Sequence, residues 1–152
     1  MNTLKLLEYS QYLRHKYLAT LSKLPWEEVI KDRGASFPSL RDIYLHMIFV
    51  VDAYINYGLQ GNQNYPNVNY NEYDSIEKIT KYLEDVESRA NANLSKMTPE
   101  ELAKNEVVLL DLFQEETHHR GELLALLWQM DVAPPHMGFL QYRLSQKRKP
   151  RV

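Results

Sequence analysis

Residues 107–130 read VVLLDLFQEETHHRGELLALLWQM, a long apolar stretch with a short polar interruption in its middle. Apolar residues recur here every three or four positions, which predicts one long amphipathic helix. The expected buried stripe is Val108, Leu112, Glu115, His119, Leu123, Leu126 and Met130. Glu115 and His119 therefore break the core pattern. Side chains four residues apart lie one turn apart on one helix face, so these two can converge on a point.

Three other segments of the chain, residues 3–23, 39–59 and 75–97, show the same helical spacing. Their expected buried stripes are, in order, Leu6, Leu7, Tyr12 or Leu13, Tyr17 and Leu21; Ile43, His46, Val50, Ala53 and Tyr57; and Ile76, Ile79, Leu83, Val86, Ala90 and Leu94. In the second stripe, a histidine occupies a position where an apolar side chain is expected. The chain therefore contains four helical segments, and two of them carry polar residues on the core face.

Helix-start and helix-stop residues separate these segments. Ser39 can cap the second helix, and Thr98 followed by Pro99 is typical of a helix start. The last helix can break at Asn105 and ends before Pro134. Residues 24–38 and 62–74 form long connections, which permit a crossover between helices. We predict an all-α four-helix bundle, with residues 1–152 forming one domain and a frayed basic tail at about residues 145–152.

Composition limits the chemistry of the chain. Its 152 residues contain 44% hydrophobic and 25% charged side chains, typical of a globular domain. The absence of cysteine excludes disulfides, thiolate metal sites and a nucleophilic thiol from the chain itself. Any metal ion must therefore be bound through nitrogen and oxygen.

Charge and hydropathy give no sign of a nucleic-acid or membrane partner. The 18 Lys and Arg residues nearly balance 20 Asp and Glu residues. The basic run from Lys147 to Arg151 is interpreted as a solvated end rather than a binding arm. The longest wholly apolar run, Met47 to Val51, is far shorter than a membrane helix, and the first residues resemble no signal peptide. We expect a cytoplasmic protein.

His46, Glu115 and His119 are the candidate metal ligands. Histidine nitrogen and carboxylate oxygen are ordinary donors to divalent ions, and two facing helices could bring the three side chains together. The alternative is a hydrogen-bonded Glu115–His119 pair and a histidine satisfied in the core. His118 faces another direction. A di-iron site is disfavoured because no second Glu-x-x-His lies on another helix, and the His-Glu-x-x-His signature of zincin proteases is absent.

Two stretches resemble the signature regions of the DinB/YfiT-like family. They are Ser36-Phe-Pro-Ser-Leu-Arg-Asp-Ile-Tyr-Leu-His46 and Gln114-Glu-Glu-Thr-His-His-Arg-Gly-Glu-Leu123. The resemblance extends by helix layout over nearly the whole chain. It implies that His46 is the first metal ligand, that His119 is the last, and that the middle ligand, usually histidine, is replaced by Glu115. Glu122 replaces the usual glutamine, with no clear consequence for metal binding.

The resemblance also implies an up-down-down-up bundle, a homodimer, and a metal ion at one end of a cleft. Two histidines and one carboxylate suit zinc, nickel or ferrous iron with open positions. The implied function is a metal-dependent enzyme acting on a small-molecule substrate, either a hydrolase or a transferase that uses a low-molecular-weight thiol such as mycothiol, bacillithiol or glutathione. The alternative is a non-catalytic dimeric bundle with a structural ion.

Two residues next to the candidate ligands have two possible roles each. Asp42 could orient His46 or serve only the helix start, and Arg120 could bind an anionic group or an ordinary partner.

Overall fold

The computed structural model describes residues 3–148, and every regular element among them is helical. The α-helices are α1 (Thr3–Ser22), α2 (Trp26–Ile30), α3 (Leu40–Val51), α4 (Ile76–Ser95), α5 (Pro99–Lys104), α6 (Glu106–Gln129) and α7 (Phe139–Lys147). A π-helix, η1 (Asp52–Tyr57), and two 3-10 turns, η2 (Gly58–Gln60) and η3 (Tyr70–Glu72), complete the set. The predicted all-α class is confirmed.

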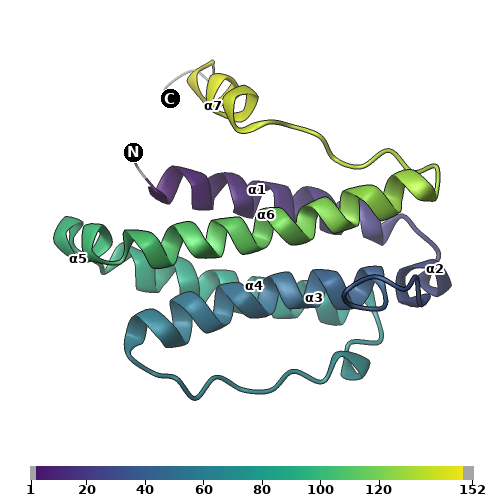
Figure 1. Ribbon diagram of the computed structural model, residues 1–152, viewed down its shortest axis with the longest axis horizontal. Coiled ribbons are helices and arrows are strands. Elements are labelled where there is room, and N and C mark those ends of the chain that lie inside the picture. The colour runs from purple at the N-terminus through teal and green to yellow at the C-terminus, as the bar shows by residue number, and fades with distance from the viewer. Residues whose placement is uncertain (1–2, 149–152) are drawn as a thin grey trace.

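The four longest helices lie alongside one another. Figure 1 shows α1 next to α6, with α3 and α4 on the other side of α6. The short helix α2 lies at one end of this group, and α5 lies at the opposite end. The connection between η2 and α4 returns along α3, and α7 crosses over α1. No helix within residues 3–148 is long and apolar enough to cross a membrane.

The predicted helix starts are present. Ser39 Oγ accepts a hydrogen bond from the Asp42 amide at 3.1 Å, and Ser75 Oγ accepts one from the Lys78 amide at 3.3 Å. Thr98 and Glu101 form a capping box in front of α5. These bonds satisfy amide groups that have no partner within a helix, and they fix where α3, α4 and α5 begin.

The second helical segment differs from its prediction. It continues through residue 60 as expected, but it changes from α-helix to π-helix at Asp52 and to a 3-10 turn at Gly58. Gly61 then ends it with a φ of 74°. Because the wider π turn changes the phase of the side chains, Ala53 and Tyr57 are half-buried and Ile55 is buried instead.

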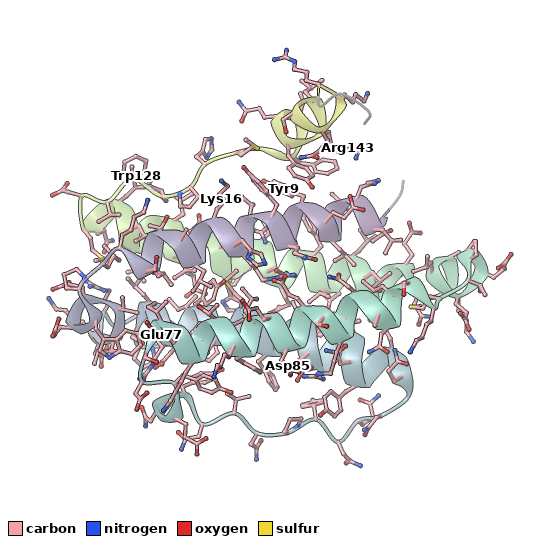
Figure 2. All side chains as sticks on the ribbon, turned by 180° about the vertical axis from the view of Figure 1, so that it is seen from behind. Tyr9, Lys16, Glu77, Asp85, Trp128 and Arg143 are labelled. Carbon is pink, nitrogen blue, oxygen red and sulfur yellow. The ribbon has the colours of Figure 1, made fainter. Side chains whose placement is uncertain are left out.

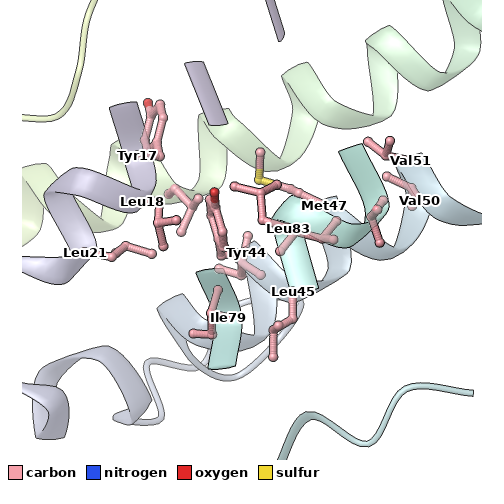
Figure 3. Packing of buried hydrophobic residues seen from close by; sticks show 14 of the residues in the cluster. Tyr17, Leu18, Leu21, Tyr44, Leu45, Met47, Val50, Val51, Ile79 and Leu83 are labelled. Atoms are coloured by element: carbon pink, nitrogen blue, oxygen red, sulfur yellow. The ribbon is translucent and has the colours of Figure 1, made fainter. Parts of the chain in front are cut away.

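The core forms where α1, α3, α4 and α6 meet. Figure 3 shows Tyr17 and Leu21 of α1 beside Tyr44 of α3 and Ile79 of α4. Tyr44 is fully buried, and its hydroxyl donates to the Arg14 carbonyl at 2.8 Å. Helix α3 buries residues around most of its circumference rather than along the one predicted stripe, because neighbours cover it on several sides.

The predicted stripe of α6 is wrong by one position at several places. The buried residues are Leu109, Leu112, Glu116, His119, Arg120, Leu123 and Leu127. Val108 is 38% exposed, and Glu115, Leu126 and Met130 are only half-buried. Helix α6 packs against α1 as well as α3, so its buried surface is wider than a single stripe and includes Glu116 and Arg120.

The structure has three short helices besides the four predicted segments, and two of them, α2 and α7, were not predicted. Helix α2 lies within the connection 24–38, α5 is separated from α6 at Asn105 as anticipated, and α7 follows the Pro134-Pro135 pair. The expectation of a frayed tail from residue 145 is wrong for Ser145–Lys147, which belong to α7. Tyr142 and Phe139 hold α7 against Tyr9 of α1. Arg148 is the C-cap of α7, and residues 149–152 of the predicted tail lie outside the described residues.

Candidate metal centre

The structure brings together the three residues that the sequence singled out. His46 comes from α3, and Glu115 and His119 come from consecutive turns of α6. One nitrogen or oxygen atom from each lies within 4.8 Å of the other two, and the two imidazole ring centres are 4.5 Å apart. Three donors at this separation can reach one divalent ion after small side-chain movements.

His46 lies at the edge of the core. Its ring is stacked on Phe37 with a centre-to-centre distance of 4.3 Å, and Phe49 lies on another side at 6.1 Å. Burial lowers the pKa of His46, the neighbouring His119 lowers it further, and Glu115 and Glu122 oppose the shift. The neutral imidazole that results is the form that binds a metal ion.

His119 is buried, and a carboxylate lies near each of its ring nitrogens. Nδ1 lies 2.6 Å from Glu122 Oε1, and Nε2 lies 3.4 Å from Glu115 Oε2. The short contact to Glu122 assigns the proton to Nδ1 in the neutral ring, since a carboxylate only accepts. Nε2 then has its lone pair on the side of Glu115 and His46.

Glu122 is a site residue to which sequence analysis assigned no role. It accepts hydrogen bonds from His119 and from the Ser36 hydroxyl, which lies in the connection before α3. Burial raises its pKa, but the bonds from Ser36 and His119, together with the nearby histidine charges, leave the pKa below its usual range. A carboxylate that fixes the tautomer of a ligand histidine is a common outer partner in metal sites. Its three-residue spacing from His119 was the available signal.

Glu115 is less enclosed than predicted. Its side chain is 43% exposed, whereas the sequence placed it on the buried face. The candidate centre therefore lies at the surface end of the contact between α3 and α6, with solvent on the side of Glu115. An exposed carboxylate needs no buried counter-charge, so Glu115 can exist with or without a bound ion.

His118 lies at the rim of this centre rather than away from it. Its side chain is 69% exposed, its ring centre is 5.0 Å from that of His119, and Nε2 is 3.8 Å from Glu122 Oε1. His118, His119 and Glu122 form a second group with suitable donor distances. All three come from one helix, and Glu122 is already bonded by Ser36, so the group with His46 is the better enclosed candidate.

Two neighbours of the ligands serve the fold instead. The Asp42 carboxylate accepts from Arg41 Nε at 2.9 Å, and no bond to His46 is present within residues 3–148. Arg120 points toward α1, where it donates to Ser10 at 3.1 Å, and it also donates to Thr117 of its own helix at 3.0 Å. At 5% exposure, Arg120 is not the surface partner that the sequence also allowed.

An aromatic cavity lies farther along α3 and α6, and none of the three candidate ligands lines it. It has a volume of about 360 Å³, and Phe49, which also contacts His46, forms part of its wall. Other lining residues are Tyr54, Leu59, Tyr65 and Val108. The Tyr54 hydroxyl donates to Asp111 at 2.5 Å, and this bond is the main reason that the pKa of Tyr54 rises to about 12. The cavity can accommodate a small molecule, and Phe49 is the residue that links it to His46.

Residues 1–151 match the DinB family over almost the entire chain. The chain belongs to the DinB family. A search of curated proteins finds no match to it.

The DinB family is metal-binding, and the donor set of this member fits a divalent ion. Two neutral imidazoles and one carboxylate give nitrogen and oxygen ligands with a single negative charge, a set found in catalytic zinc and ferrous sites. Glu122 contacts His119 and is itself held by the Ser36 hydroxyl, which supplies the outer support that such ligands need. The DinB resemblance drawn from the sequence is confirmed.

Proposed function

We propose that this DinB-family protein is a divalent-metal-dependent enzyme that acts on a small molecule. The ligands are His46, Glu115 and His119. The observation that carries the proposal is the convergence of their donor atoms, from two helices, within 4.8 Å of one another. Zinc, nickel and ferrous iron match this donor set.

Three protein ligands leave coordination positions open, which is the pattern of catalytic rather than structural sites. A divalent ion bound there would lower the pKa of a water molecule or thiol placed on it. Glu122 would keep the proton of His119 on Nδ1, so that Nε2 faces the ion. Phe37 would shield the His46 ring from water on one face.

The reaction we favour is a hydrolysis or a thiol-dependent transfer. The chain contains no cysteine, so a thiol nucleophile would have to come from a low-molecular-weight cofactor. The aromatic cavity beside Phe49 is the proposed substrate site, because its tyrosines and apolar residues suit a small, partly apolar molecule. A non-catalytic bundle with a structural ion is the competing function, and the half-exposed Glu115 argues against it.

The proposed architecture is a four-helix bundle of α1, α3, α4 and α6 in up-down-down-up order. It is supported by the directions of the helices, since α1 and α6 run one way along the molecule and α3 and α4 run the other way (Figure 1). We also propose a cytoplasmic homodimer. Light scattering that gives the mass of a single 18.0 kDa chain at micromolar concentrations would contradict the dimer.

Metal titration tests the site. Zinc or nickel titrated into chelator-stripped, tag-free protein should bind with one site per chain, and His46→Ala and Glu115→Ala should weaken binding by tenfold or more. Glu115→His should retain binding with a changed preference between metals. His136→Ala is the matched control, because His136 is exposed and outside both candidate metal groups. Equal weak binding by wild type and all variants would refute the metal site.

Cobalt substitution distinguishes a metal site with open coordination positions from one whose positions are all occupied by protein ligands. If positions are open, adding a small thiol to cobalt-loaded protein should produce a sulfur-to-cobalt charge-transfer band, without loss of cobalt. Azide should change the visible spectrum in the same way. A spectrum that neither reagent alters, with cobalt retained, would favour the structural ion over the enzyme.

A further inference from the structure

A second cleft lies on the opposite side of α6, between α1 and α4. It has a volume of about 180 Å³, and none of the candidate metal ligands lines it. Figure 2 shows the molecule from the side on which α1 and α4 lie next to each other. Glu8, Asn91 and Ser95 are exposed lining residues and mark its mouth. Its inner wall is mainly apolar and is formed by Leu7, Val51, Ile55, Ala90, Leu94 and Leu112.

Three buried charged side chains also line this cleft. They are Arg14 of α1, Glu87 of α4 and Glu116 of α6, each no more than 5% exposed. Arg14 Nε donates to Glu87 Oε1 at 3.2 Å, and Arg14 Nη1 donates to Glu116 Oε2. Buried charges are normally retained only when they are paired and hydrogen-bonded.

One polar atom of this cluster has no partner. Both oxygens of Glu87 are used, because Oε2 contacts His15 Nε2 at 2.8 Å. Arg120 lies 3.7 Å from Glu116 Oε2, the same oxygen that Arg14 contacts. Glu116 Oε1 is buried and has no hydrogen-bond partner among residues 3–148. A buried acceptor without a donor is unfavourable, and this one belongs to a residue that lines a cleft large enough for a ligand.

We propose that this cleft is a binding site for a small primary amine, whose ammonium group donates to Glu116 Oε1 while its apolar part packs against the leucine and alanine wall. The atom that lacks a partner is an acceptor, so the ligand must bring a donor. Arg14 has its Nε and Nη1 engaged by glutamates, which disfavours an anionic ligand. Three glutamates and one arginine line the cleft, which favours a positive charge.

The volume limits the size of the amine. A dry engineered cavity of about 150 Å³ in another protein binds benzene, so a cleft of about 180 Å³ fits one ring with a short side chain. Benzylamine has this size and is protonated at neutral pH. Benzyl alcohol has nearly the same shape without the charge, and benzoate has the opposite charge.

The experiment titrates benzylamine into methyl-labelled protein in the presence of chelator, so that the metal centre plays no part. Saturable shifts are expected in the methyl groups of Leu7, Ala90 and Leu112, while those of Leu45 stay unchanged. Benzyl alcohol and benzoate should bind at least tenfold more weakly. Benzylamine that shifts no cleft methyl, or binds no better than the alcohol, would overturn the proposal.

Two variants test whether Glu116 binds the ammonium group and whether the ligand occupies this cleft. Glu116→Gln keeps the shape and should raise the dissociation constant for benzylamine at least tenfold, whereas the neighbouring Glu115→Gln should leave it unchanged. Ala90→Leu should abolish binding by filling the cleft. Equal binding by Glu116→Gln, or a loss in Glu115→Gln, contradicts the site. If Glu116→Gln does not fold, Ala90→Leu decides, and undiminished binding by it refutes the proposal.

Discussion

Glu115 and Glu116 are adjacent in sequence and have opposite environments. The Glu115 side chain is 43% exposed and faces His119 and His46, whereas Glu116 is fully buried and bonded to Arg14. Successive residues of a helix are rotated by about 100°, so the two carboxylates leave α6 on different sides. Helix phase therefore assigns different roles to these two neighbouring carboxylates. One side of α6 carries a candidate metal centre, and the other carries a buried ion cluster.

The largest expected effect is on the ion cluster. Arg14→Ala should lower the free energy of unfolding by about 3–5 kcal/mol, because it leaves Glu87 and Glu116 buried without their common partner. Urea unfolding of the chelator-treated protein measures this loss. Lys5→Ala removes an exposed ion pair from the same helix and should change stability by no more than about 0.5 kcal/mol. Similar losses of unfolding free energy in both variants would show that the buried cluster stabilises the fold no more than an exposed ion pair does.

Metal removal should lower the unfolding free energy through the candidate metal centre, on the side of α6 that carries Glu115 and His119. At a free zinc concentration one hundred times the dissociation constant, bound ion should add about 2.7 kcal/mol to the unfolding free energy of wild type. Chelator should remove this increment. Glu115→Ala should lose most of it while differing little from wild type in chelator, since the carboxylate it lacks is half-exposed. A large loss of stability in chelator would show that Glu115 supports the fold.

Substitutions of Glu122 should have a smaller effect, confined to the affinity for zinc. Glu122→Ala removes the acceptor for the Nδ1 proton of His119 and should weaken zinc binding about 10- to 100-fold. Glu122→Gln keeps an acceptor oxygen and should lose less than Glu122→Ala. Calorimetric titration of both variants orders the effects. Zinc binding by Glu122→Ala that equals wild type would mean that this carboxylate does not support the site.

Much of the helical layout could be predicted, because it depends on local patterns. The apolar series, the serine cap before α3 and the Thr98-Pro99 start of α5 act within a few residues of the chain. His46, Glu115 and His119 were found because they interrupt apolar stripes. Their meeting in space follows from the packing of α3 on α6.

The remaining features depend on contacts between distant segments. Burial of Glu116 requires Arg14, which lies 102 residues earlier, and the support of Glu122 requires Ser36, which lies 86 residues earlier. The π-helix at Asp52 coincides with a buried carboxylate that accepts from Asn56 at 2.7 Å and pairs with Arg89 of α4 at 2.9 Å. Periodicity within one helix carries no information on partners of this kind.

The smallest predicted effect concerns Asp42, a carboxylate one turn before His46 that makes no bond to that histidine within residues 3–148. Its side chain pairs with Arg41 and lies in the first turn of α3, where a negative charge is favoured by the helix dipole. Asp42→Asn should therefore lower the unfolding free energy by about 0.3–1 kcal/mol and leave zinc affinity unchanged. Urea unfolding and calorimetry on the same protein measure both quantities. A fall in zinc affinity with unchanged stability would instead place Asp42 behind His46 as an orienting acceptor, and it would extend the metal centre to the start of α3.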